Sequence, residues 1–190
     1  MNIKFNKDNH EYSVDGVVYP SVTQVINNLG LIDTQWFKPE HAARGSHIHL
    51  ACQYLDEGCL DYDSLDEEYK PYIDAYKRFL NDCKPEWVGI EQKIFHPIYK
   101  YCGTYDRSGM MFGNNITLDI KTGIYHHTHA LQLAGYEQTI TDDKSSKRYS
   151  LYLSRDTTYK LIQHKERMDY KIFNNACSVY WWAKNKGVLK

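Results

Sequence analysis

The stretch NITLDIKTG, residues 115–123, places an acid and a base two positions apart at the end of an apolar run. Strand side chains alternate between the two faces of a sheet, so Asp119 and Lys121 would project from the same face. Charged groups on a buried strand are costly unless they pair or bind something. Two interpretations follow: an ion pair exposed on the open side of a sheet, or a carboxylate and an ammonium placed together for chemistry.

A third charge joins this pair if the preceding strand forms a β-hairpin with it. The turn signal is Gly113–Asn115, and a two-residue turn at either of its positions puts Asp106 on the face shared by Asp119 and Lys121. The earlier of these turns sets Asp106 opposite Lys121, whereas a three-residue turn would move it to the other face. Two carboxylates beside one ammonium are an arrangement that a divalent cation would stabilise.

Several helices and strands are needed to hold these charges in place. After a β-meander at 2–20, hydrophobic periodicity and turn signals predict helices, strands, a helix, strands and a last helix. The expected helices are 22–29, 39–56, 65–83, 126–141 and the last 20 or so residues from Lys165, and the expected strands are 86–96, 100–112, 115–122, 148–154 and 158–164. Ser21 would cap the first helix, and Pro71 would lie in the first turn of the third. This order indicates an α/β or α+β sheet core with helices packed on it.

Composition narrows the class of protein. The chain has 190 residues, a net charge of −1 and 42% apolar residues, which suits one soluble domain. It has no apolar run long enough to cross a membrane and no signal-peptide core, so we expect an intracellular, cytoplasmic protein. The five cysteines form no CxxC pair, so we expect neither a zinc ribbon nor an iron–sulfur cluster.

Charge is distributed unevenly along the chain. From Lys144 to the end there are 11 Lys and Arg against 3 Asp and Glu, whereas the preceding 143 residues hold 12 basic and 21 acidic side chains. The basic quarter suggests a polyanionic partner, and the acidic remainder suggests solvated surface or a carboxylate site for metal cations. Charge scattered for solubility alone is the alternative.

Four short motifs, taken in order, resemble those of the PD-(D/E)xK nuclease superfamily and, within it, the RecB-like exonuclease branch. GSHIH (Gly45–His49) is similar to the G-x-x-x-H motif of an N-terminal helix, and GTYD (Gly103–Asp106) to the G-x-x-D motif with the first metal carboxylate. DIK (Asp119–Lys121) is similar to the (D/E)-x-K motif, and QLAGY (Gln132–Tyr136) to the Q-x-x-x-Y motif on the next helix. Each motif is weak alone, but the ordered set is specific. Tyr105 departs from members with proline before the first acid.

The resemblance implies an α/β fold with a central mixed β-sheet flanked by helices, a restriction-endonuclease-like nuclease core. Residues 1–190 would form a single nuclease domain, with the meander and short helix at 1–38 and the nuclease core at 39–190. The implied activity is that of a metal-dependent deoxyribonuclease, foremost an exonuclease acting on DNA ends in recombination, repair or replication. A structure-specific or nicking endonuclease and a catalytically silent nucleic-acid-binding module are the alternatives, and the intact acid–acid–lysine set disfavours the second.

The resemblance also assigns roles to residues. Asp106, Asp119 and Lys121 would be catalytic, with Lys121 orienting or deprotonating the attacking water or stabilising charge on the phosphate. The metal ligands would be His49, Asp106, Asp119 and the backbone carbonyl of Ile120. Oxygen ligands suit Mg²⁺, and an imidazole favours tolerance of Mn²⁺.

Other residues are expected to lie near the site without being catalytic residues or metal ligands. Glu91 lies on the strand before the hairpin and is expected near the metal. Gln132 and Tyr136 are one helical turn apart, and would contact the substrate strand, buttress the lysine or pack at the edge of the core. The low-ranked candidates for substrate binding are Arg44, Thr122 and His129. A helix-surface salt bridge is the alternative role for Arg44.

Two further sets of side chains invite rival interpretations. A transition-metal site would use the histidines His126, His127 and His129, but their spacing matches no zinc motif. Aromatic side chains that would stack on bases, or more typically pack in a core, are Trp36, Tyr180, Trp181 and Trp182.

The expected partners follow from the same resemblance. They are single- or double-stranded DNA ends and a recombination or annealing protein, with no membrane partner. An oligomer suits this class, although no residue indicates one. The size resembles that of phage recombination exonucleases and the mitochondrial genome maintenance exonuclease, so a phage gene in a bacterial host would fit.

Overall fold

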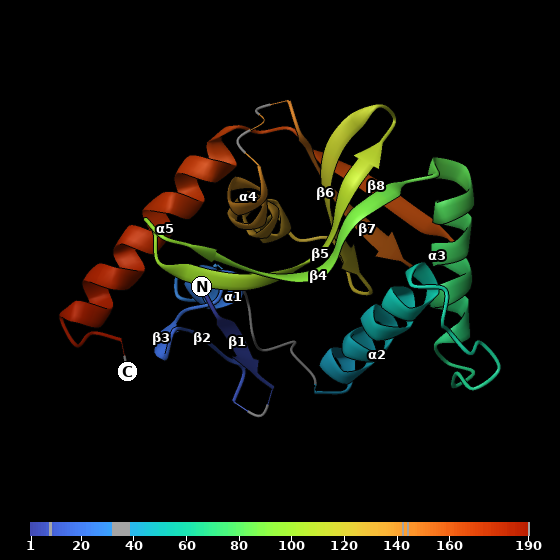
Figure 1. Cartoon of the computed structure of the whole chain (residues 1–190), viewed down its shortest axis with the longest axis horizontal. Helices are drawn as coiled ribbons and strands as arrows, with labels where there is room; N and C mark the ends of the chain where they lie inside the picture. Colours follow the sequence, from blue (N-terminus) through green and yellow to red (C-terminus); the bar gives the residue numbers. More distant parts are fainter. Residues whose placement is uncertain (8, 32–38, 142, 144, 190) are drawn as a thin grey trace.

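The structure is a computed structural model that describes residues 1–190 except 8, 32–38, 142, 144 and 190 (Figure 1). Its helices are α1 (Val22–Asn27), α2 (Pro39–Asp56), α3 (Lys70–Cys83), α4 (Thr128–Ile140) and α5 (Met168–Asn185). Its strands are β1 (Ile3–Asn6), β2 (Glu11–Val14), β3 (Val17–Tyr19), β4 (Glu86–His96), β5 (Tyr101–Met111), β6 (Asn114–Lys121), β7 (Lys147–Leu153) and β8 (Tyr159–His164). The predicted order of helices and strands is confirmed.

A mixed five-stranded sheet forms the centre of the molecule, in the order β4-β5-β6-β7-β8. All neighbours are antiparallel except β6 and β7, which run parallel. Parallel neighbours need a crossover, and α4 supplies it between the end of β6 and the start of β7. The predicted α/β fold with a central mixed sheet flanked by helices is therefore confirmed.

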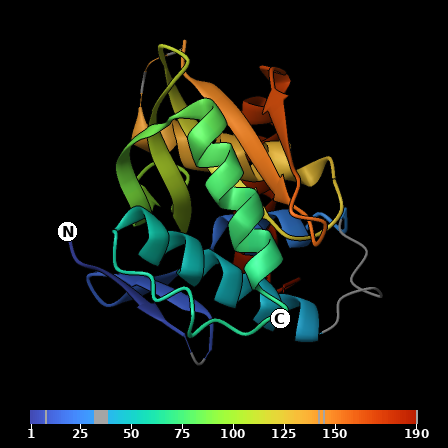
Figure 2. The same ribbon diagram turned by 90° about the vertical axis from the view of Figure 1, so that its right-hand side faces the viewer.

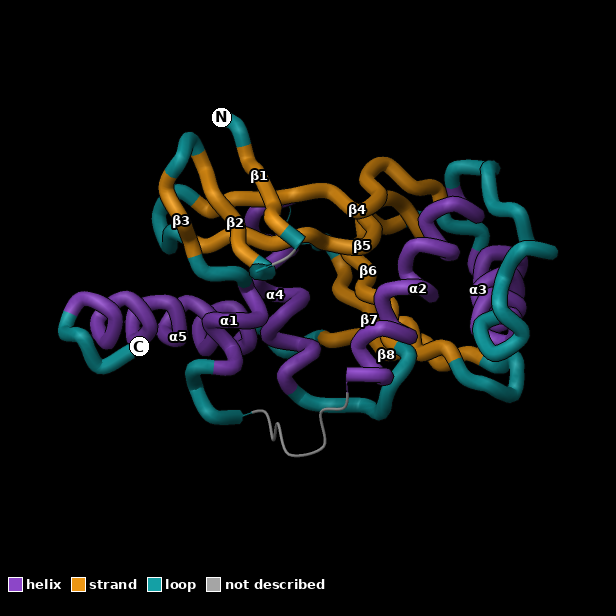
Figure 3. The backbone as a smooth tube through the Cα atoms, turned by 90° about the horizontal axis from the view of Figure 1, so that it is seen from below, coloured by secondary structure: helices purple, strands orange, loops and turns teal. Residues whose placement is uncertain are grey.

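Helices cover both faces of this sheet. Helices α2 and α3 lie on one side, where Figure 2 shows α3 running across the strands, and their apolar residues form a core with β6 and β7. Helices α1, α4 and α5 lie on the other side and form a second core with β5 (Figure 3). The end of β6, where Asp119 and Lys121 lie, is thus enclosed by helices rather than by solvent.

The N-terminal strands form a separate three-stranded meander, as predicted. Tyr12 and Val14 of β2 pack with Cys102 of β5, and the Tyr12 hydroxyl lies 2.8 Å from Thr104 Oγ1. Ser21 then caps α1 with a complete capping box that includes Gln24, as its side chain predicts. These contacts attach the meander to the strand that carries Asp106.

The hairpin turn differs from the prediction. Strands β5 and β6 are joined by Phe112–Gly113, whose φ angles of 52° and 70° are both left-handed, as in a type I′ turn. The pairing runs from Met111 opposite Asn114 to Arg107 opposite Leu118, and extending it by one residue sets Asp106 opposite Asp119. The predicted turn at Gly113–Asn115 was wrong because both asparagines lie in β6, where the Asn114 side chain donates to the Phe112 carbonyl. The turn still has two residues, so the three charges keep the predicted common face.

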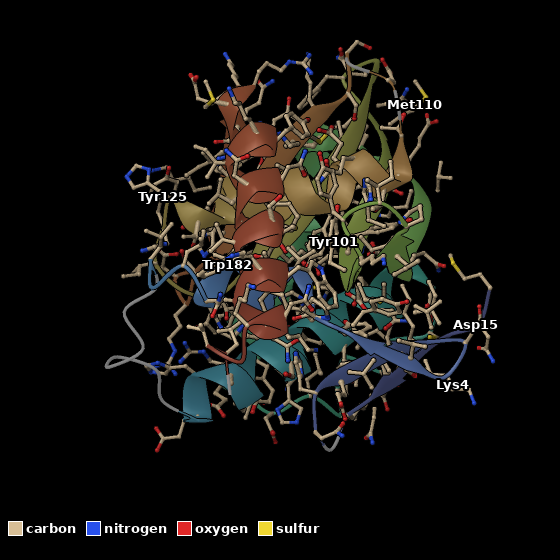
Figure 4. The ribbon with its side chains drawn as sticks, turned by 90° about the vertical axis from the view of Figure 1, so that its left-hand side faces the viewer. Lys4, Asp15, Tyr101, Met110, Tyr125 and Trp182 are labelled. Carbon is tan, nitrogen blue, oxygen red and sulfur yellow. The ribbon has the colours of Figure 1, made fainter. Side chains whose placement is uncertain are left out.

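The C-terminal helix only partly fits the expectation of a core position for its aromatic residues. Trp181 donates its Nε1–H to the Tyr99 carbonyl at 3.0 Å, and Tyr180 packs against the second core. Trp182 is 60% exposed on α5 (Figure 4), so a core position is wrong for this residue. Its ring projects from the helix because residues one position apart on a helix point in different directions. Trp36 lies outside the described residues.

The remaining sequence expectations concern cysteines and membrane spans. The five cysteines are free thiols, and three of them are buried. Within the described ranges, none of the helices combines the length and the apolar character that crossing a bilayer requires.

Candidate metal centre

Three possible ligands converge from three different elements. His49 of α2, Glu91 of β4 and Asp106 of β5 each offer an atom within 4.8 Å of the atoms of the other two. His49 and Asp106 were predicted ligands, and Glu91 was ranked below them. Carboxylate oxygens and one imidazole nitrogen suit Mg²⁺ or Mn²⁺, so this group of residues fits a divalent cation of that kind.

Asp106 is the residue to which the others connect. Its Oδ2 accepts a hydrogen bond from the backbone amide of Ile120 at 2.6 Å and lies 3.4 Å from His49 Nδ1. Burial acts to raise the pKa of Asp106, but His49 and then Lys121 hold it below its ordinary value. Asp106 is therefore an anion that is fixed by the neighbouring strand.

His49 reaches Asp106 from the middle of α2. Burial is the largest single effect and lowers its pKa, but the charge and hydrogen bond of Asp106, together with the charges of Glu91 and Asp119, outweigh burial and raise the pKa to about 9. Without a cation the imidazole thus carries a proton and pairs with Asp106. A histidine must lose that proton to bind a metal, so metal affinity at this centre will increase with pH.

Glu91 is held in an unusual backbone conformation. Its φ is 48°, a left-handed value that costs a side-chain-bearing residue roughly 1 kcal/mol or more. Burial, and next the charge of Asp106, raise the pKa of Glu91 to about 7. Such strain is typical of positions where function rather than stability sets the conformation.

Asp119 and Lys121 form the second half of the centre. Asp119 is only 2% exposed, and its Oδ2 lies 2.6 Å from Lys121 Nζ, within ion-pair distance although outside hydrogen-bond geometry. Burial raises the pKa of Asp119 to about 6. The charge of Lys121 opposes this rise, and the charge of Asp106 adds to it. An exposed pair on an open sheet face, the alternative interpretation of these residues, is wrong.

A hydrogen-bonded chain leads from Lys121 to α4. Lys121 Nζ donates to Gln132 Oε1 at 2.8 Å, and Gln132 Nε2 donates to the Tyr136 hydroxyl at 3.0 Å. The ring of Tyr136 lies so close to Gly103 that a Cβ there would approach it to 2.7 Å. Gly103 and the glutamine–tyrosine pair are thus parts of one arrangement that fixes where the ammonium points.

The other predicted site residues have less direct places. Ile120 meets Asp106 through its amide, and the predicted role of its carbonyl as a ligand stays a prediction. Arg44 lies over the ring of Tyr72 at 5.9 Å, and its buried Nε has no hydrogen-bond partner among the described residues. Thr122 borders α2, since a Cβ on Gly45 would lie 3.7 Å from its Oγ1.

His126, His127 and His129, which lie at the start of α4 and just before it, do not form a metal group within the described residues. His129 Nδ1 lies 2.6 Å from the Tyr152 hydroxyl, while the ring of His126 contacts that of His129. Burial, followed by the nearby charge of Lys121, lowers the pKa of His129 to about 3, so the ring is neutral. His129 therefore lies near the lysine without adding charge to the centre.

Sequence reasoning missed Arg107, which contacts the centre, and Asp56, which contacts Arg107. Arg107 is fully buried and donates to Glu91 Oε1 at 3.0 Å and to Asp56 Oδ2 at 2.7 Å. Arg107 follows Asp106 in a strand that is buried along most of its length, and an arginine there was the signal that could have revealed it. Asp56 gives no comparable signal, because it ends a helix with many other polar residues.

An opening connects the centre with solvent. A cavity of about 520 Å³ is lined by Lys7 and by residues of α2, and both His49 and Glu91 contribute to its wall. Two of the three possible ligands are thus accessible from one side of the sheet. The lining holds a cation at its rim, which suits an anionic ligand.

Comparisons with known proteins show the fold. Neither a family model nor a curated protein matches this chain. Among solved structures, the protein named "Putative exonuclease" from Eubacterium rectale is similar, with a TM-score of 0.51, 9% identity, and coverage of 77% of this chain and 69% of that one. The structure of SSO0001 matches with a TM-score of 0.41 and 17% identity over 60% of this chain and 57% of that chain, so this chain spans little more than half of that protein. The likeness to the Eubacterium rectale protein shows a shared fold.

Proposed function

We propose that this chain is a metal-dependent deoxyribonuclease, and specifically an exonuclease that acts on DNA ends. The observation that carries the proposal is the convergence of His49, Glu91 and Asp106 within 4.8 Å, with the Asp119–Lys121 pair on the adjoining strand. Buried carboxylates converge here, and Asp106 raises the pKa of both Glu91 and Asp119, which favours a site for a divalent ion. The fold shared with a protein that bears an exonuclease name adds weaker support.

The residues divide the work of phosphodiester hydrolysis between them. When bound, a divalent cation would activate a water and neutralise charge on the phosphate. Asp106 and His49, with Glu91 or Asp119, would hold that cation. Lys121 Nζ, restrained between Asp119 and Gln132, would orient the attacking water or stabilise the phosphate charge. Gln132 and Tyr136 would keep the ammonium in that position.

The substrate would be one strand of DNA at its end. The cavity beside His49 and Glu91 would admit the backbone, and Lys7 would contact a phosphate. The basic C-terminal quarter would add general attraction for a polyanion. The meander packs on β4 and β5, which supports one nuclease domain that includes the N-terminal strands.

The test uses 5′-labelled, 3′-labelled and circular DNA with Mg²⁺ or Mn²⁺, and with EDTA. We expect shortening of linear DNA only, which stops with EDTA and with Lys121→Met. The matched control is Lys4→Met, which removes an exposed lysine from β1, outside the basic quarter, and should leave the rate unchanged. Cleavage that survives EDTA would contradict the metal mechanism. Equal cutting of circular DNA would replace the exonuclease with an endonuclease, and binding without cleavage would indicate a silent module.

A further inference from the structure

Arg107 connects three elements beneath the candidate metal centre. Its side chain is fully buried, and it donates from Nε to Asp56 Oδ2 at 2.7 Å and from Nη1 to Glu91 Oε1 at 3.0 Å. Nη1 also donates to the backbone carbonyl of Asp106 at 2.7 Å. One guanidinium thus ties the end of α2 to β4 and to β5.

Asp56 is anchored for this contact. The Tyr76 hydroxyl donates to Asp56 Oδ2 at 2.7 Å, and Trp87 Nε1 donates to Oδ1 at 3.2 Å. A carboxylate at the last residue of a helix faces the negative end of the helix dipole, so it needs a specific partner. Arg107 is that partner.

The same helix carries His49. Residues seven positions apart lie on one face of a helix, so α2 presents His49 to Asp106 and Asp56 to Arg107 from the same side. Fixing Asp56 therefore fixes the distance of His49 from the centre. Arg107 restrains two of the three converging groups, one through the helix and one directly through Glu91.

Stability alone does not account for this arginine. Its Nη2 is buried and has no hydrogen-bond partner among the described residues. A buried ion network is often no more stable than apolar residues of the same shape, and an unsatisfied polar atom adds a further cost. Glu91 adds its own strain through its left-handed φ of 48°. Each partner of the Arg107–Glu91 hydrogen bond thus has an unfavourable feature, an unpaired buried nitrogen in Arg107 and a strained backbone in Glu91. Together they point to a role in the site.

We propose that Arg107 is a positioning residue that holds Glu91 and the His49 helix in the geometry that binds the cation. The inference rests on the proposed metal-dependent function. The guanidinium engages Oε1 of Glu91 and leaves the other carboxylate oxygen for the ion. Because its planar fork reaches Asp56 and Glu91 at once, a lysine at this position can satisfy only one of them.

The test compares Arg107→Lys with Arg148→Lys in the full chain. Arg148 is the other buried arginine among the described residues and contacts none of the converging groups. Calorimetric titration with Mn²⁺ alone, without DNA, measures affinity separately from activity. We expect Arg107→Lys to weaken Mn²⁺ binding by about 10–100-fold, and Arg148→Lys to leave it unchanged.

A second readout separates positioning from folding. With Arg107→Lys, the rate of DNA hydrolysis should return toward the wild-type value at high Mn²⁺, because the defect lies in metal affinity. If Arg107→Lys does not fold, Asp56→Asn, which keeps the shape of the anchor and loses its charge, should show the same weakened Mn²⁺ binding.

The outcomes distinguish the two proposals. Unchanged Mn²⁺ affinity in Arg107→Lys and Asp56→Asn, together with lost affinity in Asp106→Asn, would overturn the positioning role and leave the proposed function intact. A wild-type chain that binds no Mn²⁺ would overturn the metal-dependent function itself. Equal loss of Mn²⁺ affinity in Arg148→Lys would also contradict the positioning role. It would show that replacing any buried arginine loosens the fold and so weakens Mn²⁺ binding.

Discussion

Two buried groups of charged residues lie on the same sheet and differ in how their carboxylates are arranged. The first, the metal cluster, comprises His49, Glu91, Asp106 and Asp119. The second, the Arg148 cluster, comprises Glu137, Arg148 and Asp169. Both are largely withdrawn from solvent and both include a carboxylate that is at most 2% exposed.

In the Arg148 cluster, the arginine forms ion pairs and hydrogen bonds with groups of the protein itself. Arg148 lies 3.0 Å from Asp169 and 3.7 Å from Glu137, and it donates to the carbonyls of Ala130 and Glu166 at 3.0 and 2.7 Å. It also lies over the ring of Tyr170 at 4.5 Å. Every nitrogen of this guanidinium has a partner, so the cluster joins β7 to α4 and α5 as a structural element.

The metal cluster differs in how close its carboxylates lie to one another. Its carboxylates face each other closely enough that Asp106 raises the pKa of both Glu91 and Asp119. The two groups can therefore be told apart by whether their carboxylates act on one another or share a single arginine. Converging carboxylates with raised pKa values mark the group that fits a divalent cation.

The largest contrast is expected in activity. Asp106→Asn removes an oxygen anion from the metal cluster and should lower the rate of DNA hydrolysis at least about 1,000-fold, since metal polarisation supplies several kcal/mol. The matched change in the other cluster, Asp169→Asn, should alter the rate only a few-fold. Single-turnover cleavage of labelled DNA measures both. Similar losses in the two variants would end the distinction between the clusters.

The next largest contrast is in stability. Arg148→Met leaves Glu137 and Asp169 without their buried cation and should lower the free energy of unfolding by about 3–5 kcal/mol. Urea unfolding in EDTA gives this number, and Mn²⁺ titration of the folded variant should match the wild type. A loss below about 1 kcal/mol would show that the Arg148 cluster does not hold the helices on the sheet.

A smaller effect of opposite sign is expected at Asp119. Without metal, its buried charge is opposed by burial and by Asp106, so Asp119→Asn should raise the free energy of unfolding by about 0.5–2 kcal/mol. Added Mn²⁺ should stabilise the wild type but not the variant. Thermal unfolding in EDTA and in Mn²⁺ tests this, and a variant that is less stable than wild type in EDTA would show that the buried charge of Asp119 is not destabilising.

The smallest expected effect concerns pH near the Arg148 cluster. His164 is buried beside Ser150 at 2.9 Å, and burial, followed by Arg148, lowers its pKa below the ordinary 6.5 while Asp169 opposes this. A lowered folded-state pKa means that stability is complete above pH 6.5 and is lost as the pH falls. His164→Gln should flatten the decline of the melting temperature below pH 6.5, whereas His41→Gln, at an exposed position, should not. An unchanged slope in His164→Gln would show that His164 is protonated without cost.

The sequence could predict the parts of the centre that depend on local pattern. Hydrophobic periodicity located β6 and α4, and the alternation of strand side chains put Asp106, Asp119 and Lys121 on one face. One helical turn separates Gln132 and Tyr136, so they were predicted to share a helix face, and the resemblance of this pair to the Q-x-x-x-Y motif placed them near the lysine.

Other parts depend on contacts between distant segments and leave no such pattern. Arg107 and Asp56 are 51 positions apart and meet only because α2 packs on the sheet. The left-handed φ of Glu91 is imposed by its surroundings, since glutamate does not favour it. The turn was misplaced because Gly113 and the two asparagines give overlapping turn signals, and the choice among them is made by strand pairing.

The tight turn at Phe112–Gly113 has a consequence for how genes of this kind can diverge. With a two-residue turn, the two acids remain on a common face only while their separation along the chain stays odd. Insertions and deletions between Asp106 and Asp119 are then tolerated in pairs, one residue in each strand. Among relatives that keep both acids, the length of this segment should therefore vary in steps of two, whereas relatives that lack either acid are free of that restriction.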